Sequence, residues 1–157
     1  MSDKVHYIPA GYHSVTPYLY IDGAAKAIEF YKQAFGATEV MRLPGPDGKI
    51  AHAEIQIGDS RVMMSDESEQ MKAYSPKHYG GVSGTLMVYV PDVDATFKQA
   101  VAAGATVNRP PADQFYGDRT AGVEDPFGHH WYLGTHIRDV SQEEMKQAMQ
   151  QMAGASA

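Results

Sequence analysis

The chain of 157 residues carries a formal charge of −6, contains no cysteine, and is 43% hydrophobic and 20% charged. This length suits one domain, or two small fused halves, around a substantial core. The missing cysteines exclude disulfides, thiolate metal sites and cysteine nucleophiles. The negative charge disfavours binding to nucleic acid or anionic membranes, and no apolar run reaches the roughly 18 residues that a membrane helix needs.

The first residues, MSDKVHYIPAGYH, lack the basic and apolar blocks of a secretory signal peptide. The absence of cysteine agrees with a reducing compartment. We therefore expect a cytoplasmic protein that binds neither nucleic acid nor membranes.

The first half begins with a predicted strand at 17–21, PYLYI, followed by Asp22 as a candidate helix cap. Apolar residues at helical spacing follow, and Gly36 stands where a helix should end. Those apolar residues are Ile28, Tyr31 and Phe35. Three further strands are predicted at 37–43, 50–57 and 61–65, separated by the turn sequences PGPDGK and GDS.

The second half repeats this order. The sequence KQAFGAT at 32–38 returns as KQAVAAGAT at 98–106, downstream of the strand-like TLMVYV at 85–90 and the helix-capping candidates Asp92 and Asp94. Three more strands are predicted at 105–109, 119–124 and 129–135. The chain is therefore predicted to be a single α+β domain of two β-α-β-β-β modules.

The module boundaries are about 13–66 and 84–136, with a linker at 67–83. A final helix is predicted at about 141–153, because Ser141 and Glu144 have the spacing of a capping box. Three methionines at helical spacing form one face of this helix, which we expect to pack on the body or on a second subunit. They are Met145, Met149 and Met152.

The chain resembles the vicinal oxygen chelate superfamily, which includes glyoxalases, bleomycin resistance proteins and extradiol dioxygenases, and within it the PhnB-like branch. The resemblance rests on TPYLYIDGAAKAIEFYKQAFGA, LPGPDGKIAHAEIQIGDS, DQFYGDR and EDPFGHHWYLGTHIRDVSQEEM. It implies a cupped, mixed sheet of eight strands with helices on its outer face and a ligand inside the cup. It also implies a homodimer.

In metal-using relatives, the resemblance implies His or Glu ligands near the start of the first strand and in the last strand of each module. The corresponding positions here hold Thr16, Thr85, Met64 and Tyr132. These side chains form a poor ligand set for a hard divalent cation. We therefore expect no metal cofactor at the positions that such relatives use.

The strand IAHAEIQI at 50–57 alternates in polarity. His52, Glu54 and Gln56 share one face, which we expect to line the cup, while the apolar face packs on a helix. His52 and Glu54 are close enough along the strand to share a proton. A structural hydrogen-bonded pair is the alternative.

The segment EDPFGHHWYLGTH at 124–136 predicts a turn followed by the last strand. Alternation places His130 and Tyr132 toward the cup, and Trp131 and Leu133 under the helices. His129 is predicted to be a solvated or hydrogen-bonded turn residue.

The motif DQFYGDR at 113–119 supplies two further candidates for ligand binding. Tyr116 is suited to stacking on a ligand, and Arg119 to binding a carboxylate or phosphate. Asp113 and Asp118 equally allow Arg119 to form an internal ion pair.

These features favour a metal-independent protein that binds a small organic molecule, such as an antibiotic or metabolite, in the cup. The alternative is a lyase, isomerase or dioxygenase-like enzyme that uses His52 and Glu54. A relocated divalent metal, such as Zn, Ni, Mn or Fe, on His52, Glu54 and His130 belongs to this alternative. A third hypothesis assigns the function to the outer surface, through the linker and the last helix.

Overall fold

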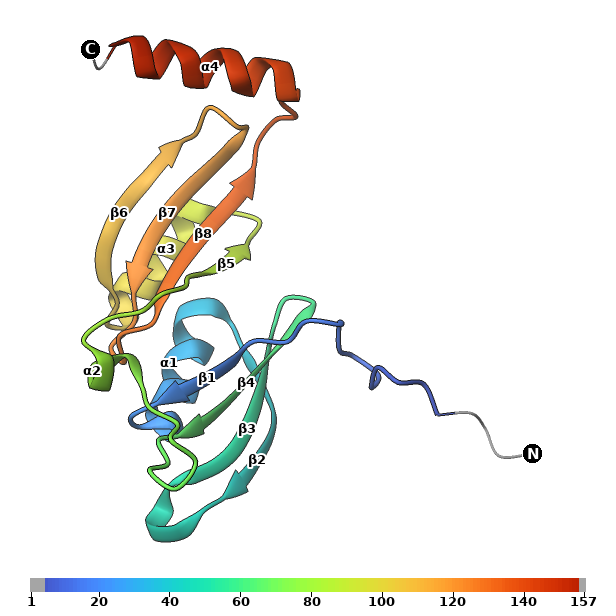
Figure 1. Cartoon of the computed structure of the whole chain (residues 1–157), viewed down its shortest axis with the longest axis vertical. Helices are drawn as coiled ribbons and strands as arrows, with labels where there is room; N and C mark the ends of the chain where they lie inside the picture. Colours follow the sequence, from blue (N-terminus) through green and yellow to red (C-terminus); the bar gives the residue numbers. More distant parts are fainter. Residues whose placement is uncertain (1–4, 156–157) are drawn as a thin grey trace.

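The computed structural model describes residues 5–155 and contains the two predicted modules (Figure 1). Module 1 consists of β1 (Tyr18–Ile21), α1 (Ala24–Phe35), β2 (Thr38–Pro44), the one-turn η1 (Pro46–Gly48), β3 (Ile50–Ile57) and β4 (Ser60–Asp66). A linker with the short α2 (Pro76–Tyr79) follows. Module 2 consists of β5 (Leu86–Tyr89), α3 (Val93–Ala103), β6 (Thr106–Asp113), β7 (Asp118–Glu124) and β8 (His130–His136), and α4 (Gln142–Ala155) ends the chain.

The predicted fold class is confirmed, although the eight strands form two separate four-stranded sheets. Their orders are β1-β4-β3-β2 and β5-β8-β7-β6, so the two modules have the same topology. In each sheet the first and last strands of the module pair in parallel, and the remaining pairs are antiparallel. Because β1 and β5 are both edge strands and are not hydrogen-bonded to each other, one continuous sheet does not form.

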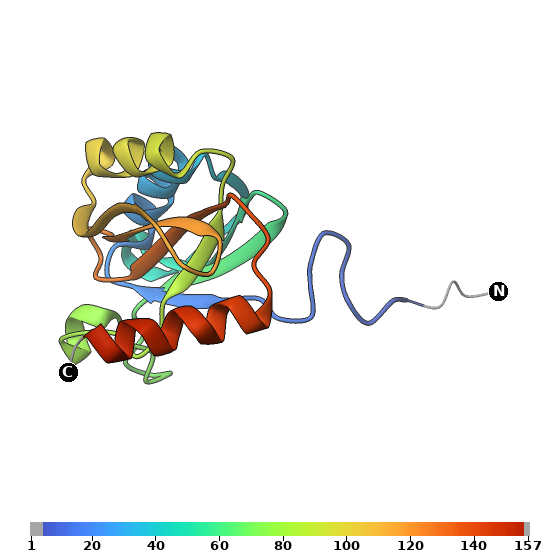
Figure 2. The ribbon, with the colours of Figure 1, turned by 90° about the horizontal axis from the view of Figure 1, so that it is seen from above.

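Each sheet has one face covered by helices, and α1 and α3 lie on the same side of the molecule (Figure 2). Ala53, Ile55 and Met64 are fully buried beneath this helical layer. We call the opposite face of each sheet its inner face. Because side chains alternate along a strand, Tyr18, Glu54 and Met63 lie on the inner face of module 1.

The two modules share one cluster of buried side chains. Tyr31 of α1 contacts Trp131 of β8, with ring centroids 5.2 Å apart. The buried Asp125 joins both residues, because its Oδ2 accepts hydrogen bonds from Tyr31 Oη at 2.6 Å and Trp131 Nε1 at 2.9 Å. Trp131 and Leu133 therefore pack under the helices, as predicted.

Most of the predicted helix ends are confirmed, with one correction. Gly36 and Gly104 end α1 and α3 in the left-handed conformation, and Asp92 accepts a hydrogen bond from the Ala95 amide. Asp22 is not the cap of α1, however. Asp66, at the end of β4, accepts hydrogen bonds from the amides of Gly23 and Ala24 at 3.0 Å.

The strand β6 is longer than predicted, because it continues through two prolines to Asp113. Pro110 and Pro111 lack amide hydrogens, but β6 is an edge strand and needs hydrogen bonds on one side only. The register against β7 is irregular over this segment.

The last helix extends from the end of module 2 and lies on the side of the sheets away from α1 and α3 (Figures 1 and 2). The capping box is present, because Glu144 Oε2 accepts from the Ser141 amide at 2.9 Å. None of the residues of α4 is buried, so the predicted packing of its methionine face on the body is at most partial within the described chain.

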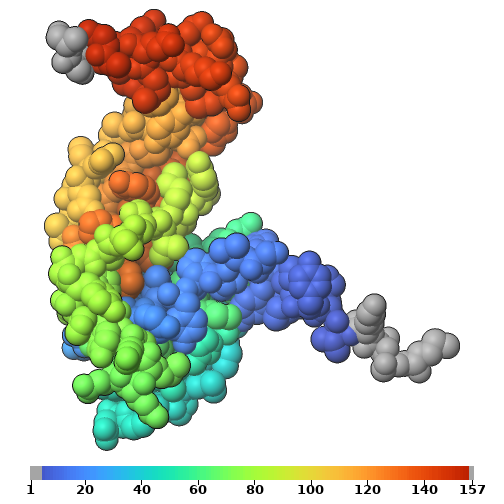
Figure 3. Space-filling view, viewed as in Figure 1, coloured from blue at the N-terminus to red at the C-terminus, as the bar shows by residue number. Residues whose placement is uncertain are grey.

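The molecule is elongated, with α4 at one end and the β2–β3 turn at the other (Figure 3). Among residues 5–155, no helix is both long enough and apolar enough to cross a bilayer. Residues 1–4, which contributed to the prediction of a cytoplasmic location, lie outside the described range.

Candidate functional site

A chain of three polar side chains lies on the inner face of module 1. Glu54 Oε1 lies 2.9 Å from His52 Nε2, and His52 Nδ1 lies 2.9 Å from the hydroxyl of Tyr18. The predicted proximity of His52 and Glu54 is therefore confirmed, and the chain extends to a residue on β1. All three side chains face the same way because β3 and β1 both flank β4.

Burial increases along this chain from Tyr18 to Glu54. Tyr18 is 41% exposed, whereas Glu54 is only 5% exposed. Oε2 of Glu54 is buried and has no hydrogen-bond partner among the described residues. A buried carboxylate oxygen without a partner is costly, so it marks a position where a donor group is missing.

An ionised Glu54 would fix the direction of both hydrogen bonds in this chain. When Glu54 is ionised it can only accept, so His52 Nε2 donates to it, and the Tyr18 hydroxyl then donates to Nδ1 of the neutral ring. A proton taken up at Nδ1 reverses the second hydrogen bond. The chain can therefore hold a proton between a buried carboxylate and a solvent-facing hydroxyl.

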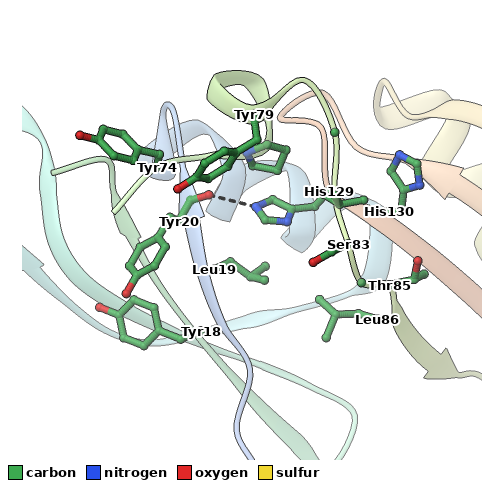
Figure 4. Close-up of a pocket in the computed structure, with 14 residues that line it drawn as sticks. Tyr18, Leu19, Tyr20, Tyr74, Tyr79, Ser83, Thr85, Leu86, His129 and His130 are labelled. Atoms are coloured by element: carbon green, nitrogen blue, oxygen red, sulfur yellow. Dashed lines mark hydrogen bonds between the residues drawn. The ribbon is translucent and has the colours of Figure 1, made fainter. Parts of the chain in front are cut away.

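Tyr18 also lines a cavity of about 410 Å³, which we call the junction pocket because β1, the linker and the start of β8 enclose it (Figure 4). Aromatic rings form much of its wall, namely those of Tyr18, Tyr20, Tyr74, Tyr79, His129 and His130. Ser83 and Thr85 add hydroxyl groups, and none of the described lining residues is Lys or Arg.

The turn before β8 fixes one side of the junction pocket. His129 Nε2 lies 3.0 Å from the carbonyl oxygen of Tyr20, and the His129 amide donates to Asp125 Oδ1 at 2.9 Å. His129 is therefore a hydrogen-bonded turn residue, as predicted, and it also joins module 2 to β1. Tyr74 stacks on His78 with ring centroids 4.0 Å apart, which orders the linker on the other side.

His130 and Tyr132 lie on the inner face of module 2, in agreement with the predicted alternation. His130 Nε2 lies 3.2 Å from Glu124 Oε2. The guanidinium of Arg109 lies over the Tyr132 ring, 5.8 Å from its centroid, and Gly122 leaves room for that ring because a Cβ there would approach it to 3.1 Å. These contacts belong to module 2 and do not include His52 or Glu54.

The relocated metal site is therefore not assembled within this chain. Among residues 5–155, no three His, Asp or Glu side chains cluster closely enough to ligate a metal ion. His130 pairs with Glu124 in module 2, whereas His52 and Glu54 pair in module 1. The physical reason is that β3 and β8 belong to different sheets.

The repeat also needs one correction at the metal positions that the resemblance implies. Tyr18 pairs with Met63, and its counterpart Met87 pairs with Tyr132, so Met63 rather than Met64 corresponds to Tyr132. Met64 is fully buried under α1. The corrected position still holds a methionine, so the ligand set remains poor.

Three other candidate residues lie apart from the junction pocket. Gln56 donates its amide to the carbonyl of Gly58 at 3.0 Å. Tyr116 lies in the β6–β7 turn, at the end of module 2 farthest from module 1 (Figure 1). Arg119 forms an internal ion pair with Asp113 at 2.9 Å, as one alternative predicted, but its other partner is Asp94 of α3 at 2.6 Å and not Asp118, which pairs with His136.

Tyr74 and Tyr79, which line the junction pocket, were not predicted from the sequence. They belong to a linker without hydrophobic periodicity, so no pattern connects them with a strand or a face. The only signal is the concentration of aromatic residues in AYSPKHY at 73–79.

The two modules share one β-α-β-β-β topology and enclose a pocket at their junction. The sequence comparison assigns this architecture to one superfamily. The profile of the Glyoxalase/Bleomycin resistance protein/Dioxygenase superfamily matches residues 11–133, and the chain belongs to this family. The match covers both modules and ends within β8.

Particular relatives are similar over most of the chain. The uncharacterized protein Mb0911c of Mycobacterium bovis is 47% identical over 139 residues, which cover 87% of this chain and 91% of that protein. The crystal structure of TioX from Micromonospora sp. ML1 matches with a TM-score of 0.62 and 26% identity, covering 82% of this chain and 100% of that one. The PhnB protein from Bacillus cereus has the same fold, with a TM-score of 0.60 and 18% identity over 78% of this chain and 99% of that one.

Proposed function

We propose that this protein binds a small organic molecule in the junction pocket and on the adjoining inner face of module 1, without a resident metal. The observation that carries this proposal is Oε2 of Glu54, a buried acceptor with no partner among the described residues. A ligand with an N–H or O–H group would satisfy it.

The surroundings of Glu54 support an organic ligand. Tyr18 and Tyr20 expose their rings on the inner face, and ring centroids of Tyr18 and His52 lie 5.5 Å apart. Met41 and Met63 flank Glu54 on the neighbouring strands. Aromatic and thioether surfaces around a few fixed polar groups are typical of small-molecule sites.

The proposed active form is a homodimer. In one chain the inner faces of both sheets are open, and large apolar side chains are exposed on them, including Leu43, Met87 and Tyr132. A second copy that covers these faces would turn the open surface into a closed cup and bury Met149 of α4. Sedimentation of the purified protein tests this part directly, since a monomer at micromolar concentration contradicts it.

Thermal shift against a library of small organic molecules tests binding in the metal-free protein. We expect hits that stabilise the wild type but not Glu54→Gln. In this variant an NH₂ group, which donates, replaces one of the two carboxylate oxygens, which only accept hydrogen bonds. Tyr18→Phe should weaken the same hits. Glu39→Gln on the outer face is the matched control, because Glu39 pairs with Arg42 far from the pocket.

Elemental analysis separates this proposal from a metalloprotein. We expect far less than one metal ion per subunit in protein purified without chelator. The same result is expected after soaking in Mn²⁺, Ni²⁺ or Zn²⁺ and desalting. Near-stoichiometric metal that disappears in both His52→Ala and Glu54→Ala would overturn metal independence and establish a metal site on these residues.

The alternative function is an enzyme of the lyase, isomerase or dioxygenase type, and the Tyr18–His52–Glu54 chain favours it. The two 2.9 Å contacts connect a buried carboxylate with a pocket-facing hydroxyl, which suits proton transfer to and from a bound carbon acid. Exchange of ligand protons with deuterated water, followed by NMR, tests this function. Exchange that is abolished in Glu54→Gln would establish it, whereas an unchanged ligand supports binding alone.

A further inference from the structure

Arg61 of β4 lies on the inner face of module 1 and has no counter-ion among residues 5–155. Its Nε is buried and has no hydrogen-bond partner among the described residues, and no described carboxylate lies within ion-pair distance of its guanidinium. The strands contain three other arginines. Arg109 is exposed, and the remaining two form ion pairs. Arg42 is paired with Glu39 at 2.9 Å and Arg119 with Asp94 at 2.6 Å.

The N-terminal segment holds this guanidinium in place. The ring of Tyr12 lies 5.4 Å from Arg61 Cζ, within the range of a cation–π contact. Gly11 lies so close that a Cβ there would approach Arg61 Nη2 to 2.9 Å, and its φ of +86° favours glycine as well. The contact with the Tyr12 ring does not fully compensate for the water that the guanidinium loses on burial. Its Nε–H is buried and donates no hydrogen bond to any described residue.

Arg61 lines a second cavity, of about 620 Å³, which we call the Arg61 cavity. It lies between the β3–β4 turn, the N-terminal segment and β5, and among the described residues it shares only Leu86 with the junction pocket. Much of its wall is apolar, and this surface includes Val15, Val62, Met87 and Trp131. Thr16, Ser60 and the ring of Tyr89 add hydroxyl groups.

One acidic side chain also lines this cavity. The carboxylate of Asp59 lies 4.0 Å from His13 Nε2 and is 90% exposed, so water screens it. The guanidinium of Arg61, with its buried Nε, is therefore the charged group of this cavity that is most shielded from water.

We propose that the Arg61 cavity binds a small organic carboxylate, with the carboxylate forked on the guanidinium of Arg61 and the apolar body against Met87 and Tyr89. A planar guanidinium matches a carboxylate in a two-point hydrogen bond. A single cation matches a monoanion, whereas a phosphate dianion would leave an uncompensated charge in an acidic protein. This site is distinct from the Tyr18–His52–Glu54 chain and does not depend on a ligand there.

Isothermal titration with matched probes tests the charge requirement on the full chain. Benzoate and hexanoate should bind measurably, whereas benzamide, hexanamide and benzylamine should bind at least about tenfold more weakly, because they cannot form the charged fork. Inorganic phosphate should not compete with hexanoate. Equal binding of benzoate and benzamide would overturn the proposal.

Substitutions assign the binding to this residue. Arg61→Gln should lose carboxylate binding, and Arg61→Lys should retain only part of it, because lysine keeps the charge without the fork. Arg42→Gln, on the outer face of the same sheet, should bind hexanoate like the wild type. Because Arg61→Lys preserves the charge, it keeps the test decisive if Arg61→Gln does not fold.

Two further measurements separate the Arg61 cavity from the junction pocket and from a subunit interface. Glu54→Gln should leave hexanoate binding unchanged, so the Arg61 proposal and the proposed function can fail independently. Sedimentation of Arg61→Gln should match the wild type. A variant that instead changes from dimer to monomer, with hexanoate having no effect on either protein, would show that a second subunit supplies the carboxylate and would overturn the proposal.

Discussion

Asp125 is a buried carboxylate of module 2 that is hydrogen-bonded to Tyr31 of module 1. It is 3% exposed, and its two oxygens accept hydrogen bonds from Tyr31, Trp131 and the amides of Phe127 and His129. Burial and the neighbouring Asp125 raise the pKa of the Tyr31 hydroxyl well above its usual value, so this residue acts as a donor throughout the physiological range.

The substitution Asp125→Asn tests this arrangement with little change in volume. An amide group would face donors that it cannot satisfy, so we expect a loss of roughly 2–4 kcal/mol in the free energy of unfolding. Tyr31→Phe, which removes one donor and leaves the carboxylate intact, should cost about 1–2 kcal/mol. Urea denaturation measures both, and an Asp125→Asn variant as stable as Tyr31→Phe would contradict the role of Asp125.

A second buried carboxylate, Asp118, organises the other end of module 2. Its Oδ1 lies 2.7 Å from His136 Nδ1, and its Oδ2 accepts a hydrogen bond from the Tyr89 hydroxyl at 2.7 Å. The other ring nitrogen of His136, Nε2, lies 2.9 Å from Asp139 Oδ1. Burial of Asp118 opposes its ionisation, but the hydrogen bonds from His136 and Tyr89 outweigh burial and lower its pKa. Hydrogen bonds to Asp118 and Asp139 raise the pKa of His136 above its usual 6.5.

These shifts predict a pH dependence of stability. Protonated His136 stabilises the fold fully below its unfolded pKa of 6.5, and this contribution is lost as pH rises through the higher folded pKa. Asp118 acts at the acidic end, where its contribution is lost as pH falls below 3.8 through the lower folded pKa. Melting temperatures measured from about pH 5.5 to 9 should show the advantage of wild type over His136→Gln shrinking with pH. A constant difference would refute the role of His136.

At the scale of elements, α4 is a well-capped helix that buries none of its residues among the described part of the chain. Its first turn is fixed by the Ser141–Glu144 box, and the hydrogen bonds of Ser141 lower the pKa of Glu144. None of its side chains is buried. The stability of a short helix comes mainly from an apolar face packed on something else, so α4 on its own is marginal.

Truncation after Val140 tests how little α4 contributes to the monomer fold. We expect the free energy of unfolding to change by less than about 1 kcal/mol, because no buried side chain is removed. Ile28→Ala in the buried face of α1 should by contrast cost roughly 2–5 kcal/mol. Measured at low protein concentration, a large loss on truncation would show that α4 packs on the body in solution.

For the whole molecule, the decisive contact is the packing of α3 on α1, since the sheets themselves do not pair. Ala100 is fully buried in the shared cluster, and Gln99 donates to the carbonyl of Gln33 in α1 at 2.6 Å. Small side chains at this position allow the two helices to approach closely.

The substitution Ala100→Leu should disturb this packing and lower the stability of the chain by about 1–3 kcal/mol, because the added methylenes have no space. Ala102→Leu is the matched control, since Ala102 lies on the exposed side of the same helix. Chemical denaturation of the two variants decides the question. Equal stability would mean that the modules do not rely on this contact.

The internal repeat allowed the fold to be predicted from the sequence. Several individual residue roles, such as the cap of α1, could be assigned only from the structure. Gly36, Gly104 and Asp92 were predictable because helix ends have local chemistry. The cap of α1 was not, because Asp66 comes from a strand more than forty residues away, as the chain positions show. The predicted correspondence of Met64 with Tyr132 failed by one residue, because the turn between β7 and β8 is longer than the turn between β3 and β4.

The sequence by itself determined the α+β class, the two modules, and the pairing of His52 with Glu54, because alternation within one strand fixes which side chains are neighbours. Only the tertiary structure decided that Tyr18 extends this pair, that His130 lies apart from it, and that Arg119 is paired while Arg61 is not. These facts depend on how separate strands and the linker meet, and side-chain partners across such distances leave no local pattern in the sequence.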